Sequence, residues 1–323
     1  AITATATTIA TAAVHPPSSS YTIDRGRNLK LKFEWMSTMQ AGIRLGVHVS
    51  ISGSIDRAID NALSIGCNAF QIFTRNPRGW AAKPLAEDDA KMFRAKLESS
   101  GISNDAVFAH MPYLPNLASP KQEIYSKSLA VLMEEVKRCS MLAIKMLVIH
   151  LGSYMGSSKE QGMRSIVNAC NEALEESKDV TILLENMVGQ RNSIGARIDE
   201  LGRLFNMLNG KRVGVCIDTC HLFAAGYELR SRDALAKVIE ELDKHIGLKN
   251  IRLLHLNDSK HALGSNVDRH EHIGLGYIGE DGFRNILASK EFRSIPWILE
   301  TPVDSRRDDV GNIRKVKELA MLI

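Results

Sequence analysis

The sequence predicts an α/β protein with the closed (β/α)8 architecture of a TIM barrel, occupying residues 41–323. From Gly42 onward, short runs rich in β-branched and aromatic residues alternate with longer segments of helical period. The alternation repeats eight times, which is the number of strand–helix units in such a barrel. The loop after the first apolar run reads Ser-Ile-Ser-Gly-Ser, which is not a glycine-rich dinucleotide-binding loop, so an open doubly wound sheet is disfavoured.

Each predicted strand is a short apolar run, and an amphipathic segment follows each one. The strands are predicted at residues 45–49, 69–73, 106–110, 146–150, 181–185, 213–218, 251–256 and 297–300. The helices are predicted at residues 54–65, 87–97, 124–142, 164–176, 198–208, 234–245, 283–289 and 312–322. Asn209 and Gly210 supply a helix stop just before the sixth strand.

Composition places the chain among ordinary globular proteins, with 44% hydrophobic and 24% charged residues. No stretch approaches eighteen consecutive apolar residues, so no membrane span is expected. The formal net charge of +4 is too nearly neutral to indicate a nucleic-acid partner by itself. Any surface that binds DNA must therefore come from local clustering of basic residues.

The first forty residues differ from the rest of the chain. They are rich in Ala, Thr and Ser at their start, and no acidic residue precedes Asp24. Residues 1–40 are therefore predicted to be a disordered tail or a targeting segment, outside the barrel. The five cysteines are an odd number in a long chain, which favours reduced, mostly buried thiols in an intracellular protein.

Side chains that bind metals stand at the ends of six of the eight predicted strands. Because the carboxyl ends of barrel strands converge on one face, these side chains are expected to meet there. A single histidine at a strand end is more often a satisfied polar residue than a ligand, but six such ends favour a metal site. The candidates are His110, His150, Glu185, Asp218, His221, His255, Asp268, His270 and Glu300.

The chemistry of these side chains narrows the metal and the reaction. Five imidazoles and four carboxylates are more than one tetrahedral ion needs. A set without thiolates suits Zn²⁺, with Mn²⁺ or Fe²⁺ as alternatives. Several such ions together are typical of phosphodiester hydrolysis. Cys216 shares the inward strand face with Asp218, and we interpret it as a small buried residue.

Three motifs carry a resemblance to a known family. They are Gly-Val-Cys-Ile-Asp-Thr-Cys-His at 214–221, His-Leu-Asn-Asp-Ser-Lys at 255–260 and Val-Asp-Arg-His-Glu-His-Ile-Gly at 267–274. Shorter matches lie at 46–50, 76–80, 110–114, 150–153 and 184–186, in the same order along the chain. From about residue 42 to its end, the chain resembles the endonuclease IV family of apurinic/apyrimidinic endonucleases.

This resemblance implies a cluster of three zinc ions. The first would be held by His110, His150 and Glu185, and Glu185 would bridge to a second that is completed by Asp218, His255 and Glu300. The third would be held by His221, Asp268 and His270. Glu185 and Glu300 are the residues we expect to be catalytic. The implied reaction is hydrolysis 5′ to an abasic sugar, giving a 3′-hydroxyl and a 5′-deoxyribose phosphate in base excision repair.

The resemblance also implies how DNA is recognised. The family inserts an arginine and a tyrosine into the duplex at the lesion, and Arg78 and Tyr113 stand at the matching positions. Trp80 either contacts DNA or packs over the barrel rim. The implied partner is double-stranded DNA with abasic sites or blocked 3′ ends, bound by a monomer. Further candidates for phosphate contacts are Lys260, Arg191 and Arg269, while His48 is expected near the metals without binding one.

Two other functions fit parts of the pattern. A metal-dependent sugar isomerase or epimerase uses the same kind of barrel with fewer metals, but it needs neither the 267–274 motif nor the 76–80 loop. A DNA-binding protein without catalysis fits less well, because so many buried ionisable groups are costly unless they hold metal. The number of metal ions per chain distinguishes the three functions.

Overall fold

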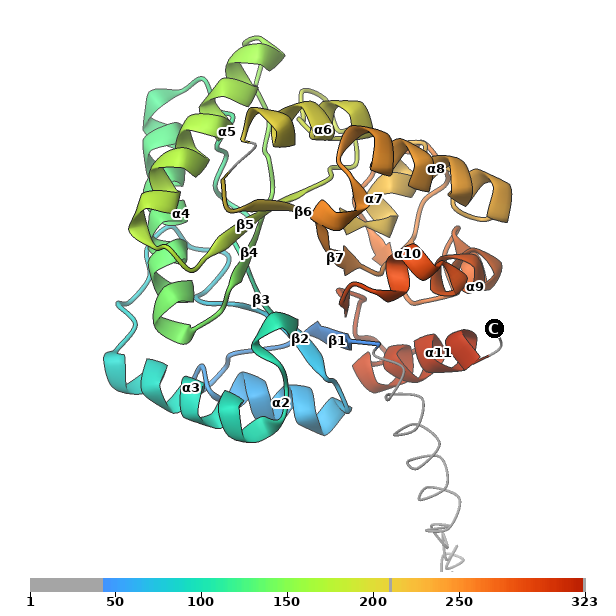
Figure 1. Cartoon of the computed structure of the whole chain (residues 1–323), viewed down its shortest axis with the longest axis horizontal. Helices are drawn as coiled ribbons and strands as arrows, with labels where there is room; N and C mark the ends of the chain where they lie inside the picture. Colours follow the sequence, from blue (N-terminus) through green and yellow to red (C-terminus); the bar gives the residue numbers. More distant parts are fainter. Residues whose placement is uncertain (1–42, 209–210, 322–323) are drawn as a thin grey trace, which may run out of the picture. The chain divides into compact units, whose positions relative to one another are not determined.

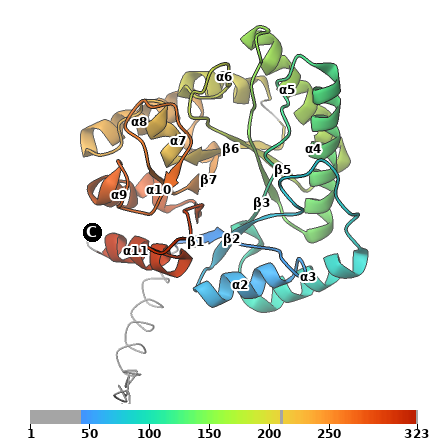
Figure 2. The same cartoon turned by 180° about the vertical axis from the view of Figure 1, so that it is seen from behind.

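The computed structural model describes residues 43–208 and 211–321, and these residues confirm the predicted closed barrel. Eight parallel strands close in the order β1-β10-β7-β6-β5-β4-β3-β2. Helices surround them, as Figures 1 and 2 show from opposite sides. The barrel strands are β1 (Leu45–His48), β2 (Ala69–Phe73), β3 (Val107–His110), β4 (Met146–Ile149), β5 (Thr181–Glu185), β6 (Val213–Asp218), β7 (Ile251–His255) and β10 (Trp297–Leu299).

The outer helices follow the strands along the chain. They are α2 (Arg57–Ile65), α3 (Glu87–Ser100), α4 (Gln122–Leu142), α5 (Lys159–Ala173), α6 (Ile198–Met207), α7 (Thr219–Ala224), α8 (Arg232–His245), α9 (Gly279–Ala288), α10 (Lys290–Arg293) and α11 (Asp309–Met321). Within the described residues, no helix is long and apolar enough to cross a membrane. The predicted tail at 1–40 and the predicted helix stop at Asn209 and Gly210 lie outside the described residues.

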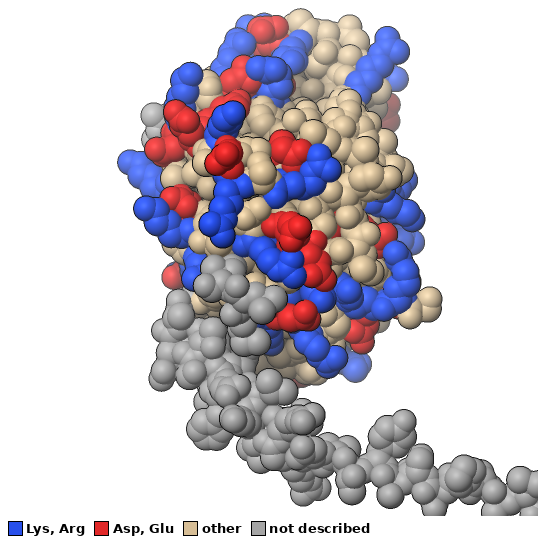
Figure 3. Space-filling view, turned by 90° about the vertical axis from the view of Figure 1, so that its right-hand side faces the viewer, with Lys and Arg blue, Asp and Glu red and all other residues tan. Residues whose placement is uncertain are grey.

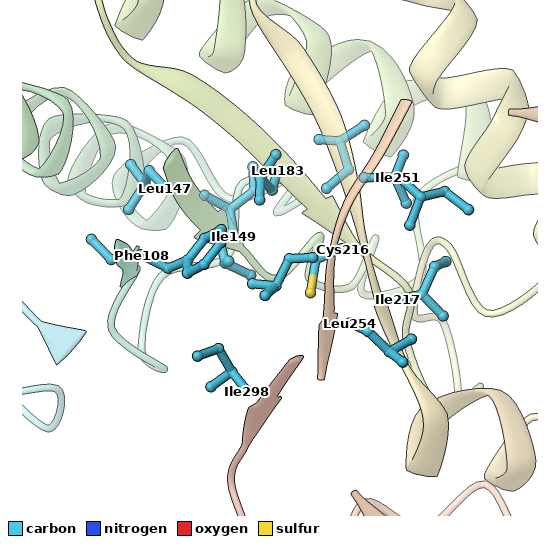
Figure 4. Packing of buried hydrophobic residues seen from close by; sticks show 14 of the residues in the cluster. Phe108, Leu147, Ile149, Leu183, Cys216, Ile217, Ile251, Leu254 and Ile298 are labelled. Atoms are coloured by element: carbon cyan, nitrogen blue, oxygen red, sulfur yellow. The ribbon is translucent and has the colours of Figure 1, made fainter. Parts of the chain in front are cut away.

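Alternation along the strands separates the packed core from the site. Successive side chains of a strand point to opposite faces, so residues two apart share a face. Leu183 therefore lies on the same face of β5 as Glu185, and Cys216 on the same face of β6 as Asp218. Figure 4 shows Leu183 and Cys216 among buried apolar side chains of the neighbouring strands. The barrel thus has an apolar floor beneath the polar ends of its strands.

Several predicted boundaries are wrong by a few residues. The parallel ladders end one residue earlier than four of the apolar runs. The residues predicted as the ends of these strands therefore lie just after them, namely Val49, His150, Leu256 and Glu300. Ala106 belongs instead to a short 3₁₀ turn, in which the Ser103 hydroxyl accepts from the Asp105 amide. The helix starts differ as well: α2 begins three residues later than predicted, and α4, α5, α8, α9 and α11 begin two to five residues earlier.

The causes of these shifts are local caps. The hydroxyl of Ser158 accepts from the Gln161 amide and starts α5 at Lys159, five residues before the predicted start at 164. The hydroxyl of Ser231 accepts from the Ala234 amide and starts α8 in the same way. The last predicted turn of α5 is a separate 3₁₀ turn, Leu174–Glu176.

Four small elements, two helices and two strands, are missing from the sequence prediction. Helix α7 begins directly after β6, capped by the Asp218 side chain, which accepts from the His221 amide at 2.8 Å. The two-residue strands β8 (Asp258–Ser259) and β9 (His270–Glu271) pair antiparallel outside the barrel. Helix α10 has only four residues. Elements this short bury too few apolar residues to show a period, yet α7, β8 and β9 adjoin the predicted ligands.

Candidate metal centre

The nine predicted metal ligands come together at the carboxyl ends of the barrel strands. Six of them line an open pocket of about 330 Å³, namely His110, His150, His221, Asp268, His270 and Glu300. Glu185, Asp218 and His255 are fully buried beside them. The convergence predicted from the strand ends is therefore present.

Glu185 is the centre of the cluster. Its Oε2 lies 3.2 Å from Nε2 of both His110 and His150. Its Oε1 lies 2.9 Å from Nδ1 of His255 and 3.5 Å from Nδ1 of His221. The two oxygens of this one carboxylate thus face two different sets of imidazoles, which is the arrangement a bridging ligand needs.

The ligand atoms fall into groups small enough to hold single ions. Within the described residues, His110, His150 and Glu185 form one group, and Glu185, Asp218, His255 and Glu300 form another. A further group joins Asp218, His221 and His270, and in each group the ligand atoms lie within 4.8 Å of one another. The Asp268 Oδ1 lies 3.3 Å from Nε2 of His221 and 3.7 Å from Nε2 of His270, next to the last group.

Backbone carbonyls orient three of the imidazoles. Nδ1 of His110 lies 2.7 Å from the carbonyl of Met111, Nδ1 of His221 lies 2.8 Å from that of Asn186, and Nδ1 of His270 lies 2.9 Å from that of Glu300. A carbonyl can only accept, so each Nδ1 donates and leaves the lone pair on Nε2. Metal-binding histidines are commonly held in this way.

His255 is turned the other way round. Its Nε2 lies 2.9 Å from Oε1 of Gln71 and donates to it, which leaves the lone pair on Nδ1, the nitrogen nearest Glu185. Each of these four imidazoles thus aims its free nitrogen at the carboxylates.

The free nitrogens provide a test of whether metal ions fit. Nε2 of His221 and Nε2 of His270 are buried and have no hydrogen-bond partner among the residues that the structure describes. A buried polar atom without a partner costs free energy, whereas the same atom as a metal ligand is satisfied. The site is also rich in nitrogen and oxygen donors at spacings suited to zinc. The residues therefore fit a metal cluster.

Charge coupling inside the cluster shifts several pKa values. Burial alone would raise the pKa of Glu185, but His255 and His150 lower it well below its usual value. Burial would likewise lower the pKa of His221, but Asp218 and Asp268 raise it well above the ordinary range. The carboxylates therefore favour positive charge on the neighbouring imidazoles, and bound metal cations can supply that charge in place of protons.

Carboxamides that sequence analysis missed hold the carboxylates in place. The Nε2 of Gln71 donates to Oε1 of Glu300 at 2.6 Å, while its Oε1 accepts from His255. The Nδ2 of Asn257 donates to Oδ2 of Asp218 at 2.7 Å, and its Oδ1 accepts from the Glu300 amide. The Oδ1 of Asn186 accepts from the Asp218 amide at 2.6 Å. Asn186 and Asn257 follow β5 and β7, whereas Gln71 lies in the middle of β2.

Cys216 behaves as predicted. It is fully buried, and burial raises the pKa of its thiol to about 12. Its sulfur lies beside Glu185 and His255 in one ligand group, but a thiol whose pKa is raised is a poor ligand. All five cysteines are buried and free, in agreement with the prediction of mostly buried thiols.

The residues predicted to contact DNA lie around the same pocket or in the loop after β2. Tyr113 lines the pocket with 58% of its surface exposed, and its ring centroid is 6.2 Å from that of His150. Arg78 is exposed and Trp80 is 39% exposed. Of the predicted phosphate contacts, Arg269 lines the pocket, while Arg191 and Lys260 are exposed elsewhere.

His48 stands next to the cluster without joining a ligand group. Its Nδ1 lies 3.0 Å from Nε2 of Gln71 and 3.4 Å from Oε1 of Glu300. Burial lowers its pKa despite the pull of Glu300. A neutral imidazole that touches a proposed ligand matches the supporting place expected for it.

Comparison with known proteins identifies the family. The model of the xylose isomerase-like TIM barrel family, named AP endonuclease 2, matches residues 59–320. A protein of Nitrosopumilus maritimus named probable endonuclease 4 is 51% identical over 279 residues, covering 86% of this chain and 100% of the relative. One of the same name from Methanoculleus marisnigri is 54% identical over 281 residues, covering 86% and 99%. The chain belongs to the endonuclease IV family.

A solved structure agrees with this membership. Endonuclease IV from Thermus thermophilus superposes with a TM-score of 0.77 and 32% sequence identity, covering 87% of this chain and 100% of the other. An endonuclease IV chain therefore shares both the fold and the length of residues 43–321. The relatives are nucleases by name, which favours the endonuclease over the sugar isomerase that the barrel alone would also allow.

Proposed function

We propose that this endonuclease hydrolyses the phosphodiester bond 5′ to abasic sites in double-stranded DNA, leaving a 3′-hydroxyl and a 5′-deoxyribose phosphate. The activity as a nuclease of DNA repair follows from the family, and the abasic substrate and three zinc ions are the proposal. Blocked 3′ ends would be a second substrate. We also propose that the protein is a monomer and that it acts inside the cell, in base excision repair.

One observation carries the proposal most directly. Glu185 and Asp218 are each shared between groups of ligand atoms, so the groups adjoin one another beside a single pocket. Ions that adjoin in this way suit a phosphodiester, whose attacking and leaving oxygens both need stabilisation. A sugar isomerase has no need of the third group, formed by His221, His270 and the neighbouring aspartates.

Each group has a proposed ion. His110, His150 and Glu185 would hold the first zinc, and Glu185, Asp218, His255 and Glu300 the second. His221, Asp268 and His270 would hold the third. When bound, zinc supplies Lewis-acid chemistry that activates water and stabilises a leaving oxygen. Mn²⁺ or Fe²⁺ could replace zinc at some of these positions.

The chain's own residues would orient and shield the reacting groups. Glu300 lines the pocket and is fixed by Gln71, so its carboxylate can hold a water molecule in line with a bound phosphate. Glu185 is fully buried and would hold the imidazoles that contact it in fixed positions. The phenol of Tyr113, whose pKa burial and the carboxylates raise to about 12, stays neutral and can donate to the sugar or stack in the gap.

Extrusion of the lesion accounts for the choice of substrate. An abasic nucleotide has no stacked base, so it costs less to extrude than an intact one. Planar side chains can fill the gap that remains, and Arg78 and Tyr113 are exposed for this purpose. Arg269 at the pocket edge would contact a phosphate.

Incision of an end-labelled duplex that holds one stable abasic analogue tests the proposed function. The expected product is a single cut 5′ to the lesion with an extendable 3′-hydroxyl, and a zinc chelator should abolish it. The intact duplex is the control. Cleavage 3′ to the lesion, or equal cleavage of both duplexes, would reject the proposed substrate. A sugar isomerase would leave both duplexes intact and would hold only one or two metal ions.

A further inference from the structure

The loop that carries two proposed ligands of the third zinc is held by a buried carboxylate. After β7 the chain leaves through β8 and returns through β9, and the register pairs Asp258 with Glu271 and Ser259 with His270. The Lys260 amide donates to the Arg269 carbonyl and extends this pairing outward. Asp268 and His270 both lie on the returning arm. Their positions therefore depend on what fixes that arm.

The side-chain carboxylate of Asp258 accepts hydrogen bonds from several backbone amides of this loop. Its Oδ1 accepts from the amides of Ser259 at 2.8 Å and Ile278 at 2.9 Å. Its Oδ2 accepts from the amides of Gly274 and Gly276, both at 2.9 Å, and the Gly279 amide lies 3.3 Å away. The residue is fully buried. Backbone amides that converge in this way form a nest that binds a negative charge.

The glycines of this segment are shaped to the carboxylate. A Cβ on Gly276 would lie 2.5 Å from Oδ1 of Asp258 and 2.4 Å from the Ser259 carbonyl, so no larger residue fits. Gly274 has a φ of +81°, in the left-handed region that favours glycine. The segment 274–279 is therefore built around one acceptor group, and nothing in these contacts includes a proposed metal ligand.

We propose that Asp258 is a positioning residue for the third metal site. By fixing the amides of residues 274–279 beside β8, it holds the returning arm so that Asp268 and His270 face His221. The inference rests on the proposed zinc cluster. It assigns a role to a residue that touches neither the pocket nor any of the nine ligands. The first two ion sites take no ligand from this arm, so only the third should depend on Asp258.

The test is a zinc titration of Asp258→Asn, which replaces one acceptor oxygen with a donor facing backbone N–H groups. We expect the third zinc to bind at least ~10-fold more weakly than in the wild type, since altered supporting contacts typically cost about 10–100-fold in metal affinity. The first two zinc ions should bind as before, and excess zinc should restore incision. A purely structural role would not produce this selective, zinc-reversible loss.

Asp243→Asn is the matched control. The Asp243 Oδ1 also accepts a backbone amide, that of Leu248 at 3.1 Å, but in the loop before β7, at the opposite end of that strand from the pocket. It should keep three zinc ions. If Asp258→Asn does not fold, Gly276→Ala is titrated with zinc instead. Its added Cβ disturbs the contact between residue 276 and the Asp258 carboxylate.

Unchanged binding of all three ions, or equal weakening of all three, would overturn the proposal. Failure of the proposed function looks different, because the wild-type protein itself would then lack three zinc ions or fail to cut abasic DNA.

Discussion

At the scale of single residues, Glu185 connects the first two groups of proposed ligands. One carboxylate faces four imidazoles that follow or end four strands, and this carboxylate is itself fully buried. Glu300 occupies the pocket side of the same cluster. The chemistry proposed for this endonuclease therefore depends on two glutamates more than on any other pair.

Changing Glu185 or Glu300 to Gln should lower incision at least ~100-fold while the barrel stays folded. A neutral side chain of nearly the same volume removes a charged ligand but keeps the local packing. The measurement is the single-turnover rate on abasic DNA, with circular dichroism and metal analysis on the same preparation. Near-normal incision with full metal content in either variant would remove that residue from the catalytic role.

The imidazoles should make zinc binding dependent on pH. Neighbouring carboxylates outweigh burial and raise the pKa values of His150 and His221 above the ordinary histidine value, which favours protons on these imidazoles before zinc binds. Zinc must displace those protons. Its affinity should therefore increase as the pH rises toward the raised pKa values and decrease as the pH is lowered.

Calorimetry in two buffers of different ionisation enthalpy measures this proton release. We expect a net release of protons on zinc binding at pH 7. His48, whose pKa burial lowers, should contribute none, so His48→Gln should release the same number. Zinc binding without proton release at pH 7 would show that the imidazoles are already neutral.

At the scale of elements, a buried charge cluster holds the loop after β2. The Glu135 Oε2 accepts from the Thr74 hydroxyl at 2.8 Å, and its Oε1 lies 2.8 Å from Nε of Arg75. Arg138 donates to the Thr74 hydroxyl at 2.8 Å and to the Lys83 carbonyl at 3.0 Å. Helix α4 thus holds both ends of the loop that presents Arg78.

Glu135→Ala should destabilise the protein by about 3–5 kcal/mol, because it leaves buried arginines without their partner. Glu134→Ala is the matched control on the same helix, since its side chain is 42% exposed and lies 3.8 Å from Arg138. A partly exposed carboxylate at this distance contributes less than about 1 kcal/mol. Urea unfolding measures both variants, and equal midpoints would show that the buried cluster adds no stability.

The loops after β2 and β3 should recognise the lesion separately from the metals. Changing Arg78 and Tyr113 together to Ala should weaken binding to abasic DNA at least ~10-fold, since stacking contributes ~1–3 kcal/mol per contact. Metal content should not change. Arg164→Ala, an exposed arginine on α5, is the control. An unchanged preference for abasic over intact duplex would exclude both residues from recognition.

At the scale of the whole molecule, charge is spread rather than concentrated. Figure 3 shows the face of α8, α9 and α11, where basic and acidic side chains alternate. Ion pairs such as Arg284–Glu280 and Lys315–Glu280 lie there. This mixture agrees with a net charge near zero and leaves DNA binding to local groups around the pocket.

The sequence was sufficient for the barrel and for the meeting of the ligands. Apolar runs of strand length mark β1 to β7 and β10, and a polar residue at a strand end must face the barrel mouth. It was not sufficient for α7, β8 and β9, which adjoin side-chain contacts of Asp218 and Asp258. Gln71 and Asn257 were missed because a carboxamide carries no signal until its partners are known.

The most direct measurement is an anomalous difference map at the zinc absorption edge from crystals of the wild-type protein. We predict three peaks. One should lie between His110, His150 and Glu185, and a second between Glu185, Asp218, His255 and Glu300. The third should lie between His221, Asp268 and His270. Each peak should lie about 2.0–2.2 Å from its ligand atoms. A single peak, or peaks bound by other residues in a preparation that cuts abasic DNA, would contradict the three-zinc centre.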